Sequence, residues 1–157
     1  MLKNLLEVSQ VGEVTWLGVR PEREQPMLIV DALEARCDKG IVGDRYSGRS
    51  GERQVTLIQA EHLATIAALL GWDEVTPEQL RRNIAVAGIN LLALKGKQFS
   101  IGGATLAYTG LCHPCSRMEK TFGSGGYNAV RGHGGITARV ITPGIIRIGD
   151  SVQTVSS

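Results

Sequence analysis

The sequence predicts a mostly β, barrel-like fold with a largely antiparallel sheet and a few short helices. Glycine accounts for 20 of the 157 residues. This is about twice the usual share of roughly 7%. Most of these glycines separate short apolar runs that are rich in β-branched residues. Many short strands joined by tight turns, with few helices between them, are typical of a closed antiparallel sheet.

Eight segments have the length and composition of strands. They are residues 14–19, 27–33, 54–58, 83–86, 98–101, 104–108, 138–141 and 151–155. Gly102 and Gly103 are expected to form a hairpin turn between the strands on either side. The glycine-rich residues 123–127 and 131–135 predict a long irregular stretch, of the kind that closes over a site or is disordered.

Two segments carry clear helix signals. Over residues 60–70 the apolar side chains recur on one face, and Gly71 is a natural stop. Thr76, followed by Pro77 and Gln79, supplies an N-cap, a proline at the first helical position and a capping side chain. The sequence therefore predicts one full helix and a second, short helix that begins after Thr76.

Length and composition predict a single domain over residues 1–157. Lys and Arg number 17 against 15 Asp and Glu, and a net charge of +2 is no signature of nucleic-acid binding. The first residues lack an apolar signal segment, and no window reaches the roughly 18 apolar residues of a membrane helix. We therefore expect a cytoplasmic protein with no nucleic-acid or membrane partner, whose three cysteines are free thiols.

Two thiols, Cys112 and Cys115, lie three residues apart at a predicted strand-to-helix junction. A thiolate whose residue opens a helix is stabilised by unpaired backbone N–H groups, and Arg117 adds positive charge. Cys115 is therefore the candidate catalytic residue. Spacing alone also allows a structural zinc site, a thioredoxin-like redox pair or two thiols that fill the core. The further ligands that zinc would need could come from Cys37, His62, His113 and His133.

Arginine side chains recur near the predicted strand ends. Arg45 follows the glycines of the loop over residues 39–46 and suits a bidentate grip on phosphate or carboxylate. Arg81 and Arg82 are adjacent guanidiniums, which repel each other unless an anion lies beside them. A solvated turn and a simple surface pair are the alternative interpretations.

The order and spacing of six segments resemble those of the MOSC domain. This domain forms the C-terminus of molybdenum-cofactor sulfurases and also occurs as small stand-alone bacterial proteins. The segments are GIVGDR at 40–45, RQVTLI at 53–58 with Glu61, LRRNIAVAGI at 80–89, GKQFSIG at 96–102, Thr109 and Gly110 with Pro114 and Cys115, and GDSV at 149–152. The resemblance covers about residues 12–155, which would be the core of the domain.

The resemblance implies a barrel-like fold and a role with the pterin-based molybdenum cofactor or with activated sulfur. In mitochondrial amidoxime-reducing components, which contain this domain, the cysteine matching Cys115 ligates molybdenum, and the residues matching Arg81 and Asn83 lie at the cofactor. His113 falls at a cofactor-contacting position, although the residue type differs. An anionic pterin-phosphate also requires positive charge and hydrogen-bond donors. The cofactor-binding residues predicted in this way are Arg45, Arg53, Arg81, Arg82, Asn83 and His113.

Larger family members carry an additional N-terminal β-barrel region, and sulfurases carry a pyridoxal-phosphate cysteine desulfurase domain; this chain is expected to have neither. Two schemes stay open. Cys115 accepts sulfur as a persulfide from a separate desulfurase, for cofactor or metal–sulfur maturation, or it binds the molybdenum cofactor directly. In the persulfide scheme, spacing allows Cys112 to resolve the mixed species, and the alternative is that Cys112 takes no part.

These schemes leave the enzyme class open between a sulfurtransferase-like protein and a molybdenum-cofactor-dependent oxidoreductase. An alternative is a molybdenum-dependent reductase of N-hydroxylated compounds, because some stand-alone family members are associated with detoxifying such compounds. Another is a non-catalytic module that binds cofactor or sulfur and delivers it. The expected partners are a cysteine desulfurase and a molybdoenzyme.

Overall fold

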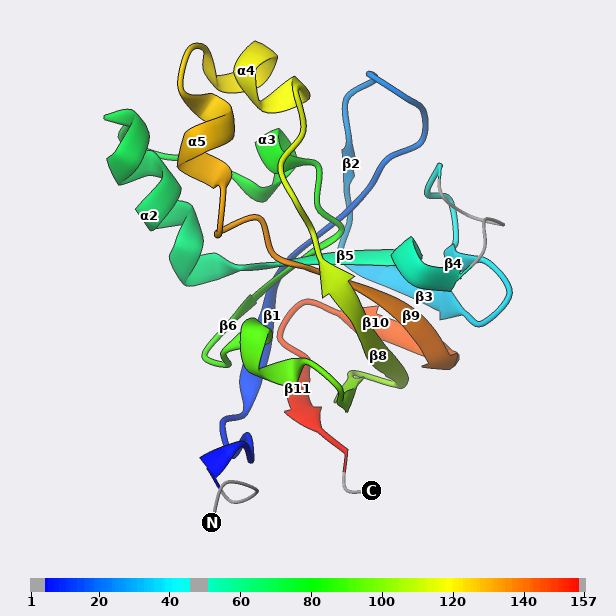
Figure 1. Cartoon of the computed structure of the whole chain (residues 1–157). Helices are drawn as coiled ribbons and strands as arrows, with labels where there is room; N and C mark the ends of the chain where they lie inside the picture. The colour runs from blue at the N-terminus through cyan, green and yellow to red at the C-terminus, as the bar shows by residue number, and fades with distance from the viewer. Residues whose placement is uncertain (1–4, 46–50, 156–157) are drawn as a thin grey trace.

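A closed sheet forms the body of the protein (Figure 1). In the computed structural model, which describes residues 5–45 and 51–155, seven strands follow one another around this barrel. In sheet order they are β11 (Ser151–Thr154), β7 (Gln98–Ile101), β8 (Ala104–Leu111), β9 (Ile136–Thr142), β5 (Val55–Gln59), β6 (Ile84–Ala87) and β1 (Gly12–Val19). Pairing of β1 with β11 closes the barrel. Neighbouring strands are antiparallel except β5 and β6, so the predicted mostly β, largely antiparallel barrel is confirmed.

A smaller sheet lies beside the barrel and corrects one predicted strand. In the part of the chain that the structure describes, its order is β10 (Gly144–Arg147), β3 (Ala32–Arg36) and β4 (Gly40–Ile41). The single strand predicted over residues 27–33 is wrong, because β2 (Leu28–Ile29) pairs with β1 whereas β3 pairs with β10. Asp31 is the one polar residue in this run, and it lies in the short gap between β2 and β3. β4, which has two residues, and β10, which has four, were not predicted.

The parallel pair β5 and β6 requires a crossover connection, and helices form it. α2 (Ala60–Leu70) has the predicted bounds, and Gly71 ends it with a φ of +72°. α3 (Pro77–Leu80) begins at the predicted cap, where the Thr76 hydroxyl accepts from the Gln79 N–H and the Gln79 side chain accepts from the Thr76 N–H. These caps satisfy backbone groups that helix ends otherwise leave free, so both helix predictions are confirmed.

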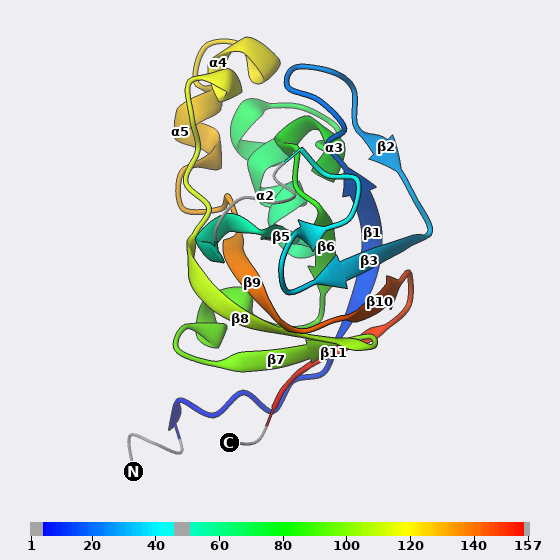
Figure 2. The same cartoon turned by 90° about the vertical axis from the view of Figure 1, so that its right-hand side faces the viewer.

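The short helices α4 (Arg117–Phe122) and α5 (Gly126–Val130) lie at the same end of the barrel as α2 (Figures 1 and 2). α5 corrects the irregular stretch expected over residues 123–135. Its five residues are too few to show a helical period. Ala129 and Val130 are buried in the same hydrophobic cluster as the apolar face of α2, so tertiary packing stabilises α5.

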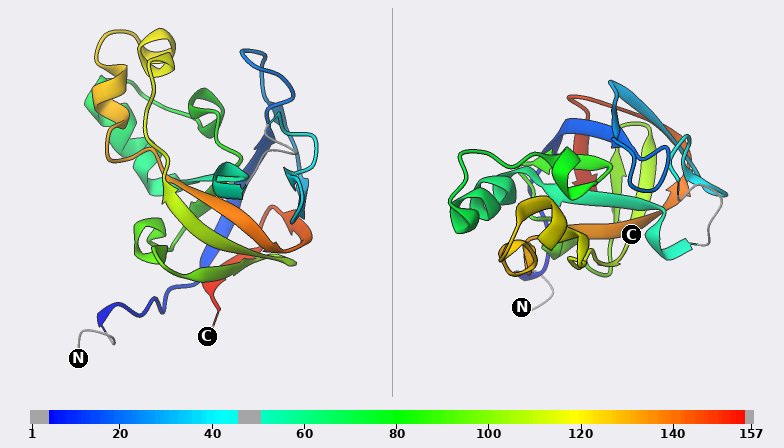
Figure 3. Two further views of the ribbon diagram at one scale, coloured as in Figure 1. Left: turned by 45° about the vertical axis from the view of Figure 1, so that its right-hand side comes forward. Right: turned by 90° about the horizontal axis from the view of Figure 1, so that it is seen from above.

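Apolar side chains fill the barrel and form a second cluster between the barrel and the helices. Phe99 and Leu57 are fully buried inside the barrel. Ile66 of α2 and Met118 of α4 belong to the second cluster, which fixes these helices to the barrel end. Figure 3 shows α4 and the loop between β1 and β2 rising on two sides of this end. In residues 5–45 and 51–155, no helix is long and apolar enough to cross a membrane.

Candidate functional site

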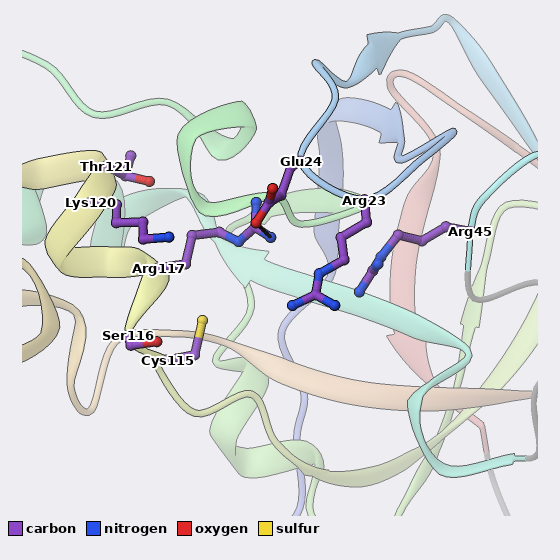
Figure 4. A pocket seen from close by; sticks show the side chains of 8 residues that line it. All are labelled: Arg23, Glu24, Arg45, Cys115, Ser116, Arg117, Lys120 and Thr121. Carbon is purple, nitrogen blue, oxygen red and sulfur yellow. Dashed lines mark ion pairs between the residues drawn. The ribbon is translucent and has the colours of Figure 1, made fainter.

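A pocket of about 580 Å³ opens between the β1–β2 loop and α4. The loop contributes one wall, the chain after β4 contributes a side chain, and the segment after β8 contributes the other wall (Figure 4). The lining residues are Arg23, Glu24, Arg45, Cys115, Ser116, Arg117, Lys120 and Thr121. Cys115 is a free, exposed thiol. A sulfur nucleophile therefore shares this pocket with several positive charges.

The end of β8 delivers Cys115 to the pocket. The Cys112 N–H donates to Gly135 O at 2.8 Å, which attaches the thiol segment to the residues before β9. The sequence places Cys115 at the first residue of a helix, but α4 begins only at Arg117. Cys115 O accepts the Met118 N–H at 2.9 Å, so this N–H group at the start of the helix already has a backbone partner. The positive charge beside the thiol therefore comes from side chains.

An ion pair connects the two walls of the pocket. Arg117 Nη2 lies 4.0 Å from Glu24 Oε1. Figure 4 shows the guanidiniums of Arg23 and Arg45 and the Cys115 sulfur directed toward the interior of the pocket. One carboxylate faces several cations among these lining residues, so the pocket is electropositive.

Arg81 lies behind the pocket and holds one of its walls. Its Nη1 donates to Gln25 O at 2.5 Å and its Nη2 to Glu22 O at 3.1 Å, both in the β1–β2 loop. Burial lowers the pKa of Arg81, and the positive charges of neighbouring arginines lower it further, that of Arg117 most. The arginines are close enough to repel one another, and an anion bound among them would relieve that repulsion.

Asn83 lies in a buried hydrogen-bond network and not on the pocket wall. Its Oδ1 accepts from Arg20 Nη2 at 3.1 Å, and its Nδ2 donates to Asp44 Oδ1 at 3.0 Å. Asp44 pairs with Arg20 at 2.9 Å, and both side chains are buried. The Arg45 N–H donates to Arg20 O at 2.6 Å. The network therefore positions Arg45 at the pocket.

Arg82 is a second buried cation, next to the thiol segment. Its Nε donates to Gly134 O at 2.8 Å and its Nη1 to Leu80 O at 2.6 Å. Its Nη2 has no hydrogen-bond partner among the described residues. Burial lowers the pKa of Arg82, whereas its interactions with Cys112 and, more weakly, with Cys115 oppose this lowering. Arg82 is thus electrostatically linked to both thiols.

Of the residues predicted for the site, Cys115 and Arg45 line the pocket. Tyr46, in the same predicted loop as Arg45, lies outside the described residues. The predicted site residues that do not line the pocket are Arg53, Arg81, Arg82, Asn83 and His113. Their predicted contacts with a cofactor stay predictions.

Some pocket residues are not singled out as binding residues by the sequence. Arg117 and Lys120 follow the thiol motif directly. They lie three residues apart on α4, and this spacing places them on one helix face. Arg23 carries no comparable signal, because it lies in an ordinary polar loop. Only the pairing of β1 and β2 brings this loop opposite α4.

The residues considered as zinc ligands do not assemble into a zinc site. Within the described ranges, no group of three or more His, Cys, Asp and Glu side chains is arranged to hold a metal ion. His62 packs edge to face on His133, with ring centroids 5.4 Å apart. The Cys37 thiol is exposed and donates to Ile141 O at 3.2 Å.

Solved structures of other proteins share the fold of this chain. YuaD from Bacillus subtilis has a TM-score of 0.81 at 23% identity, over 92% of this chain and 96% of that chain. YiiM from Geobacillus stearothermophilus has a TM-score of 0.74 at 15% identity, over 92% of this chain and 75% of that chain. YiiM from Escherichia coli has a TM-score of 0.70 at 20% identity, over 92% and 70%. At these identities the likeness concerns the fold.

No curated protein matches the sequence. The family model of the MOSC domain matches residues 25–153, a range that includes every residue lining the pocket from Arg45 onward. Since this match spans most of the chain, the protein belongs to the MOSC domain family.

Proposed function

We propose that the protein acts in molybdenum-cofactor chemistry, by binding the anionic cofactor in its arginine-lined pocket and carrying sulfur for it as a persulfide on Cys115. The observation that supports this most directly is the exposed Cys115 thiol in a pocket that Arg23, Arg45 and Arg117 also line. Membership of the MOSC domain family adds support, because the family is associated with this cofactor.

The pocket fits a phosphate-bearing pterin. Its volume of about 580 Å³ lies within the range of about 300–1,000 Å³ that is common for small-molecule sites. Arg45 and Arg117 would hold phosphate through bidentate hydrogen bonds. Thiolate sulfur is a soft ligand that suits molybdenum, so Cys115 would lie at the metal. When bound, the cofactor would supply a metal centre that accepts sulfur.

Sulfur loading requires the Cys115 thiolate and a persulfide donor, which would be a separate pyridoxal-phosphate-dependent cysteine desulfurase. Cys115 Sγ attacks the outer sulfur of the donor persulfide. A bond forms between Cys115 Sγ and that sulfur, the donor S–S bond breaks, and the donor cysteine leaves as a thiolate. Cys115 is exposed, so a donor protein can reach it, and the surrounding arginines stabilise the anionic persulfide.

A reductase of N-hydroxylated compounds would use the same pocket. No contact among the described residues favours that chemistry over sulfur carriage. A non-catalytic delivery module would also use the pocket, and it differs from a sulfur carrier because Cys115 would bind cofactor without gaining sulfur.

The first test is sulfur loading of Cys115. In a Cys112→Ser protein incubated with a cysteine desulfurase and cysteine, the peptide that contains Cys115 is expected to gain one sulfur atom, which reduction removes. Mass spectrometry of the intact protein and its peptides measures this gain. Cys115→Ser should abolish it, because the attacking thiolate is missing.

Cys37→Ser is the matched control, because Cys37 is also a free, exposed thiol but does not line the pocket. This variant should load as the parent does. Equal loading of Cys37 and Cys115, or no loading of Cys115, would contradict sulfur carriage.

The second test is cofactor binding by the arginines. Arg45→Gln and Arg117→Gln are each expected to weaken binding of released molybdenum cofactor about tenfold or more, because each removes a charge-assisted hydrogen bond worth about 1.5–3 kcal/mol. Equilibrium dialysis with fluorescence detection of the oxidised pterin measures this. Arg139→Gln, an exposed change on β9 away from the pocket, should leave binding unchanged. Identical affinities in all these proteins would exclude the pocket as the cofactor site.

A further inference from the structure

The buried charge of Arg82 requires an anion nearby. Arg82 is only 6% exposed, and its Nε and Nη1 donate to the neutral carbonyls of Gly134 and Leu80. Over residues 5–45 and 51–155, no hydrogen-bond partner meets its Nη2. A buried cation that lacks a counter-charge is strongly destabilising. A negative charge close to Nη2 would offset this cost.

Cys112 belongs to the segment next to Arg82 Nη2. A Cβ atom on Gly134 would lie 3.3 Å from Arg82 Nη2 and would collide with Cys112 O. Arg82 Nη2 and the Cys112 backbone therefore both lie next to Gly134. The interaction with Cys112 raises the pKa of Arg82, and that with Cys115 raises it less, whereas burial, Arg20 and Arg53 lower it.

The two thiols differ in access. Cys112 is 4% exposed, and its N–H is held by Gly135 O. Cys115 is exposed and lines the pocket. A donor protein can therefore reach Cys115 and not Cys112, while Cys112 has the buried cation beside it. Cys115 is therefore suited to accept sulfur from a donor protein, and Cys112 is suited to react with Cys115 inside the protein.

We propose that Cys112, with Arg82 beside it, resolves the persulfide on Cys115 and releases its outer sulfur as sulfide into the pocket. This inference rests on the proposed function. Cys112 Sγ attacks Cys115 Sγ, the bond between Cys115 Sγ and the sulfane sulfur breaks, and a Cys112–Cys115 disulfide forms. The sulfane sulfur leaves with the electron pair as hydrosulfide.

This step supplies the two electrons that the release of sulfide requires. Sulfane sulfur must gain two electrons to become sulfide, and the dithiol supplies them as it is oxidised to the disulfide. A thiol reductant then returns the pair to the dithiol, with two protons and two electrons. Arg82 acts as a positioning residue, because its positive charge attracts the negative charge of the attacking sulfur.

The experiment follows sulfur after loading. Wild type, Cys112→Ser, Arg82→Gln and Arg82→Lys are loaded by a cysteine desulfurase and cysteine, separated from both, and kept without reductant. Released sulfide is assayed, and peptide masses report a persulfide or a disulfide. Wild type is expected to release sulfide while the Cys112–Cys115 peptide loses two hydrogens.

The variants are expected to separate the two roles. Cys112→Ser should retain the Cys115 persulfide and release sulfide at least about tenfold more slowly, because the internal attacking thiolate is missing. Arg82→Gln should also slow release about tenfold, and Arg82→Lys should restore much of it because the charge returns. A merely structural Arg82 would not be rescued in this way.

The outcomes distinguish failure of this inference from failure of the proposed function. No sulfur on Cys115 in the Cys112→Ser protein would refute sulfur carriage itself. Persulfides of equal lifetime in wild type and Cys112→Ser would refute the resolving role alone. If Arg82→Gln does not fold, Cys112→Ser still decides the role of Cys112. Equal release from Arg82→Gln and wild type would refute the role of Arg82.

Discussion

Replacing Asp44 by alanine is expected to lower the free energy of unfolding by about 3–5 kcal/mol, the cost of breaking a buried ion pair by removing one partner. The Asp44 side chain is fully buried and pairs with Arg20 Nη2 at 2.9 Å. Its Oδ1 also accepts from Arg20 Nε at 3.1 Å and from Asn83 Nδ2 at 3.0 Å. The substitution removes the counter-charge of a buried guanidinium and an acceptor of a buried amide together.

Urea unfolding measures this loss, and Asp38→Ala is its matched control. Asp38 lies 3.5 Å from Arg36 in a pair whose side chains are largely exposed. Exposed pairs of this kind contribute less than about 1 kcal/mol, so the control should be nearly as stable as wild type. Similar stabilities of the Asp44→Ala and Asp38→Ala proteins would show that the buried network contributes little to folding.

Replacing Gly135 by alanine is expected to destabilise the fold by about 2–5 kcal/mol, because strain and collision add. Its φ of +91° is unfavourable for alanine, at a cost of about 1–2 kcal/mol. The new Cβ would also overlap Leu57 O and lie 2.9 Å from Leu57 C. Forced overpacking of this kind adds about 1–3 kcal/mol. Gly135 O accepts the Cys112 N–H, so the thiol segment should move as well.

Gly132→Ala isolates the strain from the collision. Gly132 lies in the same loop with a φ of +86°, but a Cβ there would meet nothing within 4 Å. It should lose only the part of the stability that the backbone conformation costs, about 1–2 kcal/mol. Thermal or urea unfolding of both variants measures the difference. Equal destabilisation by the two changes would mean that β5 does not constrain Gly135.

The elements that were predicted correctly depend on local chemistry. The helix α2 and the cap of α3 follow from an apolar period, from Gly71 and from the side chains of Thr76 and Gln79. The hairpin between β7 and β8 follows from two adjacent glycines. The elements that were missed depend on partners. β3 is separated from β2 by its pairing with β10, and α5 forms because it packs against α2.

The candidate site shows the same division. The thiol motif and Arg45 are evident in the sequence, and Cys115 of the motif lines the pocket together with Arg45. Arg23 is a pocket residue only because β1 and β2 bring its loop opposite α4. Asn83, which the resemblance assigns to the cofactor, is enclosed with Arg20 and Asp44, and no pattern along the chain distinguishes these two environments.

The sequence by itself determined the mostly β class, the main helix and the thiol around which the function is proposed, because these follow from period, capping and the spacing of a few residues. Only the tertiary structure decided which charges meet the thiols. Arg23 and Arg45 reach the pocket, and Arg82 lies buried beside Cys112, because strands distant in the chain pair around the barrel. Contacts of this kind arise from barrel closure, which no local pattern encodes.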